Sequence, residues 1–162
     1  MANQQLYLTM KIFLQQAYQG QNQQVADHAL KTLAMMVTGV ILGPHVQLYA
    51  MALCVPLPIK LASIVRRFSE FVADDRVDAQ TLFAPFVYAM QATLSADRVY
   101  LIIDCTKVGP QCRVLVIALV YHGTVLPIIW QTIAGKKGHV KGEFQKSLLA
   151  KVHAYFNRHY ID

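Results

Sequence analysis

The hydrophobic pattern of the chain changes at Asp97, and this change constrains the fold more than any other feature. Before it, apolar residues recur every three to four positions, which is the spacing of amphipathic helices. After it come continuous runs of β-branched and aromatic residues, which are typical of buried strands. The sequence therefore predicts an α+β protein, with an all-helical region over residues 1–96 and a β-β-β-α segment over residues 97–162.

Glycine, proline and polar clusters divide the helical region into five segments. The second apolar stripe ends at Gly43-Pro44, the third at Pro56 and the fourth at the turn around Asp75. Proline cannot continue a helix, and glycine readily adopts the backbone conformations that end one. Pro85 falls in or near the first two turns of the fifth helix, which leaves the start of that helix open. The expected helices cover residues 6–17, 26–41, 46–53, 59–72 and 78–94.

The second half of the chain reads as three strands followed by a helix. His122-Gly123 separates the second and third apolar runs, and a two-residue turn with glycine favours a tight hairpin. A loop rich in glycine and lysine follows at residues 135–139, and apolar side chains then recur at helical spacing over residues 144–156. The expected strands cover residues 99–104, 114–121 and 125–130.

The high apolar content, 55% of residues, raises the question of a membrane protein. The longest uncharged stretch, residues 32–59, is broken by Gly43-Pro44 and by Pro56 and Pro58. Each apolar piece has about ten residues, whereas a bilayer span needs about 20. No secretory signal opens the chain, and three cysteines without C-x-x-C spacing fit a reducing cytosol. We therefore expect a cytoplasmic protein without a membrane partner.

The formal net charge of +6 is confined to the last two fifths of the chain. Residues 1–97 hold six basic and six acidic side chains, whereas residues 98–162 hold nine basic and three acidic ones. This excess favours a polyanion as the partner of the second half. A solvated basic surface would give the same charge, so the charge alone leaves both interpretations open.

Several motifs of the chain resemble one family of DNA-processing enzymes. Residues 101–109 (LIIDCTKVG) resemble the strand that carries the first catalytic aspartate in bacterial insertion-sequence transposases of the DDE type, in the IS-four-like group. Residues 119–130 (LVYHGTVLPIIW) look like the hairpin of that group, and residues 135–139 (GKKGH) look like the loop after it. Residues 60–68 (KLASIVRRF) are similar to its N-terminal helical region. The resemblance covers most of the chain and is strongest over residues 99–139.

The resemblance implies a ribonuclease-H-like catalytic core that cleaves and rejoins DNA at the ends of an insertion sequence. In this family two Asp and one Glu hold two Mg²⁺ ions, which suits a cation that prefers oxygen ligands. Such an ion pair activates the attacking oxygen and stabilises the departing one. Asp104 matches the first aspartate, so we expect it to be catalytic and to bind the metal.

The other two carboxylates of the family have no clear match. Asp162 has no apolar strand before it, and Glu143 suits the start of the last helix, where a carboxylate interacts favourably with the helix dipole. We therefore expect a truncated core, the N-terminal part of a transposase, that binds Mg²⁺ weakly through Asp104 and does not cleave DNA alone. Whether the chain itself is an enzyme stays open at this point.

Basic residues on and around these motifs are the candidates for DNA contacts. The glycine- and lysine-rich loop suits a phosphate backbone, with a solvent-exposed turn as the alternative. On the fourth expected helix, Lys60 lies one heptad before Arg67, and arginine can read base edges in the major groove. A solvated helix face is the alternative there. The candidate DNA-binding residues are Lys136, Lys137, His139, Lys141, Lys107, Arg113, Arg66, Arg67 and Lys60.

A different functional class is a DNA-binding regulator without catalytic activity. Such a protein would occupy terminal inverted repeats, or inhibit a full-length transposase by forming mixed dimers with it. The expected partners are thus terminal-repeat DNA, target DNA and a second chain in a homodimer or mixed dimer, at the bacterial nucleoid. A three-stranded sheet also leaves an open edge, so we expect a marginally stable chain that associates.

Overall fold

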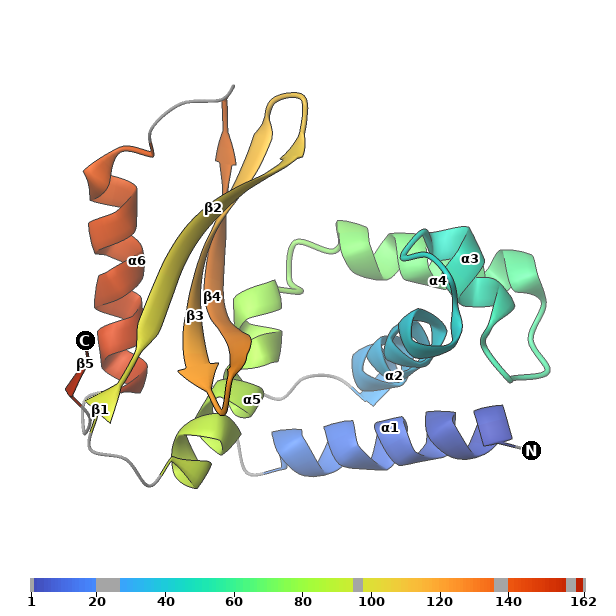
Figure 1. Ribbon diagram of the computed structural model, residues 1–162. Coiled ribbons are helices and arrows are strands. Elements are labelled where there is room, and N and C mark those ends of the chain that lie inside the picture. Colours follow the sequence, from blue (N-terminus) through green and yellow to red (C-terminus); the bar gives the residue numbers. More distant parts are fainter. Residues whose placement is uncertain (1, 20–26, 95–97, 136–139, 157–159, 162) are drawn as a thin grey trace. The chain divides into compact units, whose positions relative to one another are not determined.

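The chain forms two compact units, Met1–Ala79 and Gln80–Asp162. The computed structural model describes residues 2–19, 27–94, 98–135, 140–156 and 160–161 (Figure 1). The described part of the first unit is helical, and the second unit contains a three-stranded antiparallel sheet together with helices. The α+β architecture expected from the sequence is therefore confirmed.

The helices of the first unit pack through the apolar stripes that the sequence predicts. The first helix contacts the second, and the second, third and fourth contact one another. Each contributes buried side chains, among them Leu14, Met35, Met51 and Phe68 in chain order. The described helices of this unit are α1 (Ala2–Tyr18), α2 (Asp27–Leu42), α3 (Leu48–Leu53) and α4 (Leu61–Ala73).

Gly39 allows α2 and α3 to approach closely. A Cβ atom at this position would lie 2.6 Å from the carbonyl oxygen of Met51 and 2.8 Å from its Cβ. Both distances are too short for an ordinary contact, so only glycine fits here without a shift of α3. The crossing of α2 and α3 therefore depends on the absence of a side chain at Gly39.

The second unit is built around an antiparallel sheet in the order β2-β3-β4. His122 and Gly123 have positive φ angles of 47° and 77°, as a tight two-residue turn requires, which confirms the predicted hairpin between β3 and β4. A separate two-residue pair, β1 with β5, is parallel. The elements of this unit are α5 (Ala79–Thr93), β1 (Arg98–Val99), β2 (Leu101–Gly109), β3 (Cys112–Tyr121), β4 (Thr124–Ala134), α6 (Gly142–Tyr155) and β5 (Tyr160–Ile161).

The core of the second unit lies between the sheet and α6, which runs alongside it in Figure 1. Ile103 pairs with Ile117, which pairs with Ile129, so the three side chains lie in one row on the same face. Leu148 and Val152 of α6 are fully buried and belong to the same apolar cluster as Ile117. The strands are longer than the expected ones, because β2 and β3 continue as a ladder to Gly109 and Cys112.

Helix α5 packs with the sheet, although the sequence grouped it with the helical region of residues 1–96. The ring of Phe83 lies edge-on to Trp130 of β4, with 5.3 Å between the ring centroids. Tyr88 contacts Tyr155 of α6 in the same manner, and Val87 is buried in the apolar cluster of the sheet. The boundary between the two compact units consequently falls at Ala79, not at residue 96, because α5 buries its apolar side chains against the strands.

None of the described helices combines the length and the apolar character that a bilayer span requires. The longest of them, α1, has 17 residues and carries Lys11 in its middle.

The close approach at Gly39 generates a stability prediction. Gly39→Ala is expected to lower the free energy of unfolding by about 1–3 kcal/mol, because the added methyl group overlaps Met51. This is opposite to helix propensity, which favours alanine over glycine. Thermal or urea unfolding followed by circular dichroism measures the effect.

Gly142→Ala is the matched control for that variant. Gly142 opens α6, and nothing lies within 4 Å of the position of its Cβ, so this change should leave the free energy of unfolding unchanged or slightly raised. Equal effects of the two variants would contradict the packing argument at Gly39.

Candidate functional site around Asp104 and the basic residues

Asp104 lies in the middle of β2 and is exposed. Directly paired residues of an antiparallel sheet share a face, and Asp104 pairs with Val116, which pairs with Trp130. The next residue, Cys105, points to the other face and packs against the apolar cluster under α6. Strand alternation thus turns Asp104 away from that cluster and leaves its carboxylate accessible to a ligand.

Thr106 is the direct hydrogen-bond partner of this carboxylate. Its hydroxyl donates to Oδ2 of Asp104 over 2.9 Å. Residues two apart on a strand share a face, so the spacing in the sequence carried the signal for this contact, although Thr106 was not among the predicted site residues. The two side chains together present carboxylate and hydroxyl oxygens on one exposed patch of β2.

The described residues do not fit a complete two-metal centre. They contain no group of three or more His, Cys, Asp and Glu side chains that could hold a metal ion. Glu143 lies exposed in the first turn of α6, and Asp162 lies outside the described residues. Asp104 and Thr106 supply oxygen atoms of the kind that Mg²⁺ prefers, but a pair of ions needs further carboxylates.

Two of the predicted DNA-binding residues meet at the far end of the sheet. Lys107 of β2 pairs with Arg113 of β3, next to the turn that joins these strands. Gly135, after β4, donates its N–H to the carbonyl of Gln111 in that turn, and a Cβ on Gly135 would lie 3.4 Å from Nη2 of Arg113. The glycine- and lysine-rich loop therefore begins beside this basic pair.

The remaining basic candidates of the second unit lie within the glycine- and lysine-rich loop of residues 135–139 or just after it in the sequence. Lys141 is exposed at the start of α6, where its main chain accepts the first hydrogen bond of the helix. Lys136, Lys137 and His139 lie outside the described residues. The structure thus joins Lys107, Arg113 and the start of the loop.

The basic candidates of the first unit lie on and before α4. Lys60, Arg66 and Arg67 are all exposed, while Ile64 and Phe68 are buried. Arg66 forms an ion pair with Glu70 one turn later, with 2.7 Å between Nε and Oε1, and this hydrogen bond raises the pKa of Arg66. Arg67 makes no such ion pair within the described part of the chain. Its guanidinium is therefore more available to a phosphate or a base than that of Arg66.

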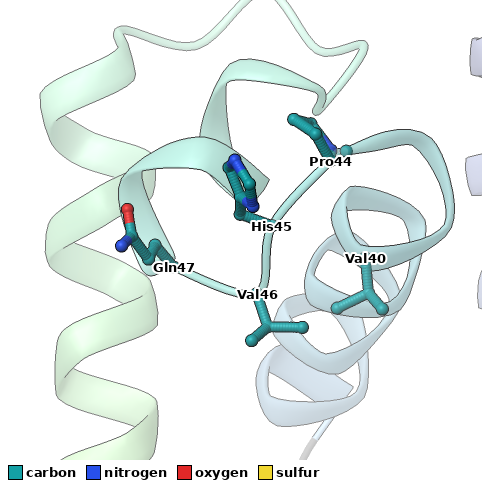
Figure 2. Close-up of a pocket in the computed structure, with 6 residues that line it drawn as sticks. Val40, Pro44, His45, Val46 and Gln47 are labelled. Atoms are coloured by element: carbon teal, nitrogen blue, oxygen red, sulfur yellow. The ribbon is translucent and has the colours of Figure 1, made fainter.

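A pocket of about 430 Å³ opens between the end of α2 and the start of α3 (Figure 2). Its polar side chains are an imidazole and an amide, and its lining holds no acidic, lysine or arginine side chain. None of the predicted site residues lies in it. The lining residues are Val40, Gly43, Pro44, His45, Val46 and Gln47.

Comparison with known proteins identifies no relative of this chain. No family model matches the sequence, no curated protein matches it, and no solved structure matches the fold.

The position of Asp104 predicts an unusual response to substitution. Aspartate is disfavoured in strands, and this side chain is exposed, so Asp104→Thr is expected to leave the free energy of unfolding unchanged or raise it by up to about 1 kcal/mol. Denaturant unfolding measures this.

Ile117→Ala tests the sensitivity of the same assay. Ile117 is fully buried in the next strand, and its truncation should cost about 2–5 kcal/mol. A loss of similar size on Asp104→Thr would mean that Asp104 has a structural role.

Proposed function

We propose that this chain is part of a DDE-type insertion-sequence transposase, in which Asp104 is one of the metal-binding carboxylates. The observation that carries the proposal is Asp104 itself: an aspartate in mid-strand, exposed, and disfavoured there by β propensity. Natural proteins break such local preferences at functional or strained sites. The residues around Asp104 are also those that resemble the first-aspartate strand of the family.

The arrangement of the second unit supports the same proposal. A ribonuclease-H-like core begins with three antiparallel strands in sequential order, followed by a helix, and the elements from β2 to α6 have that order. The parallel pairing of β1 with β5, the segment after α6, is compatible with a fourth strand beside the first.

DNA binding is the part of the proposed activity that the described residues can perform. Lys107, Arg113 and Lys141 lie in the half of the chain that holds the whole positive excess, and Lys107 and Arg113 adjoin the start of the loop. Cationic side chains on such a surface bind the phosphate backbone and release its counterions. A bound Mg²⁺ pair would supply the phosphoryl-transfer chemistry, and Asp104 is the acidic residue that β2 offers to it. We expect the 162-residue chain not to cleave DNA by itself.

A regulator that binds DNA without cutting it is the second candidate function. It is favoured by the fact that the described residues contain no group of three or more His, Cys, Asp and Glu side chains that could hold a metal ion. Such a protein would occupy terminal repeats or form mixed dimers with a complete transposase. Magnesium-dependent cleavage of terminal-repeat DNA by this chain would exclude the regulator.

The test of the proposal is sequence-specific binding to the DNA that flanks the gene of this chain. In gel shifts at about 150 mM salt, the chain is expected to bind the flanking inverted repeats more tightly than a scrambled duplex. The Lys136→Ala/Lys137→Ala variant should bind more weakly, with a salt dependence of log K reduced by nearly two in slope, because each lost phosphate contact contributes about 0.9.

Lys146→Ala/Lys151→Ala is the control with the same loss of charge. Both lysines are exposed on α6, away from the loop in the sequence, so this variant should keep the slope of the native chain. Equal losses in the two variants would show a nonspecific charge effect. An absence of any preference for the flanking repeats would overturn the proposal.

The two arginines of α4 provide a separate test of base recognition. Arg67→Ala is expected to reduce the preference for the terminal repeat about tenfold, in line with one bidentate base contact. Arg66→Ala should have a smaller effect, because Glu70 already holds the Arg66 guanidinium. Competition gel shifts with repeat and scrambled duplexes measure both. A larger loss with Arg66→Ala would contradict this assignment.

A further inference from the structure

The charged side chains of the three-stranded sheet are divided by sign between its two faces. Strands β2, β3 and β4 contain three such residues, Asp104, Lys107 and Arg113. Successive residues of a strand point to opposite faces, so Asp104 and Lys107, three positions apart, lie on different faces. Lys107 pairs directly with Arg113, which places both cations on one face and the carboxylate on the other.

The cationic face is the one that packs against α6. Arg113 pairs with Ile133 of β4, and Ile133 belongs to the buried apolar cluster that the sheet shares with α6. Cys105, two positions before Lys107 on the same face, packs against this cluster as well. The pair of Lys107 and Arg113 therefore continues the α6 face of the sheet toward the turn that joins β2 and β3.

The opposite face carries Asp104 and no cation from the sheet. Asp104 pairs with Val116, and Val116 pairs with Trp130, so this row crosses the sheet without a second charge. Phe83 of α5 lies edge-on to Trp130, and α5 contains no charged residue. A DNA strand brought to Asp104 thus meets no lysine or arginine of these strands or of α5.

The pairing of Lys107 with Arg113 is unfavourable for the sheet itself. The N–H of Val120 donates to the carbonyl of Tyr100, and bonded and non-bonded pairs alternate along an antiparallel ladder. Lys107 and Arg113 consequently form a non-bonded pair, the kind in which the side chains lie closer together. Like charges directly opposite each other destabilise a sheet, whereas an anion bound between them would offset their repulsion.

We propose that Lys107 and Arg113 form a phosphate-binding surface for a DNA segment other than the one that Asp104 faces. The proposal rests on the proposed function, because it takes DNA as the polyanion. Phosphate contacts position a protein on DNA but carry no base information, so this surface binds DNA of any sequence. The sheet then separates two tasks: one face presents the carboxylate to a strand, and the other holds a second segment by its backbone.

The salt dependence of DNA binding tests for phosphate contacts at this surface. In gel shifts, Lys107→Ala/Arg113→Ala should reduce the slope of log K against log salt by nearly two, since each lost contact contributes about 0.9. The reduction should be equal for repeat and scrambled duplexes. Lys146→Ala/Lys151→Ala loses the same charge from α6 and should keep the native slope. An unchanged slope in the first variant, or a reduction confined to the repeat, would overturn the proposal.

Lys107→Glu separates DNA binding from folding. The glutamate lies opposite Arg113, and opposite charges stabilise a ladder pair, so the free energy of unfolding should stay unchanged or rise. DNA affinity at about 150 mM salt should nevertheless fall at least tenfold, because a phosphate contact becomes a repulsion. Urea unfolding and gel shifts measure the two effects. A variant that loses stability together with DNA binding would show a structural role of Lys107 and overturn the proposal.

Two neighbouring residues of β2 allow the two faces to be mapped on DNA. Ile102 lies on the face of Asp104 and Ile103 on that of Lys107, and they are similarly exposed, 43% and 40%. Ile102→Cys and Ile103→Cys, each in a chain with the three native cysteines changed to serine, accept a cysteine-linked iron–EDTA reagent that cuts nearby DNA. On bound repeat duplex, the two reagents should cut at least one helical turn apart, about 10 base pairs.

The cutting patterns also distinguish this proposal from the proposed function. Shared cutting positions from residues 102 and 103 would place one DNA segment across both faces and overturn the two-segment proposal. Cuts spread evenly over the duplex from both residues would mean that the chain has no preferred site, which contradicts the proposed function. The salt slopes on scrambled duplex decide the phosphate-binding surface in that case, so the two proposals fail separately.

Discussion

The alternation of side chains along β3 is the constraint on which the second unit depends. Leu115, Ile117 and Leu119 are almost completely buried. They lie between the paired residues of β2 and β4, and they share an apolar cluster with side chains of α6. A slip of one residue would turn this row to the opposite face, so burial holds the register firmly. The register in turn determines which residues of β2 face the core and which face outward.

Asp104 owes its exposure to that register. Cys105 must point toward the apolar cluster, so its neighbours Asp104 and Thr106 must point away from it. The carboxylate is exposed there and accepts a hydrogen bond from the Thr106 hydroxyl. The same ladder directs the backbone groups of the odd-numbered residues of β2 away from β3.

The basic candidate residues differ in the contacts that their side chains make. Arg113 contributes to a pair at the end of a hairpin, beside the start of the loop, whereas Arg66 is held by a carboxylate on its own helix. Exposed ion pairs of the latter kind add little stability, but they occupy a guanidinium that a phosphate would otherwise meet. The positive excess therefore lies in the second half of the chain, while the contacts of the basic side chains differ from residue to residue.

Local sequence patterns are sufficient to predict the helices of the first unit, the hairpin at His122-Gly123 and the α+β class, and the composition shows the charge asymmetry. These follow from spacing, turn chemistry and composition, which act over a few residues. The folded chain was needed to show that α5 packs with the sheet, that Gly39 lies against Met51 and that Asp104 faces away from the core. Each of these depends on contacts between segments far apart in the chain, which a local pattern does not encode.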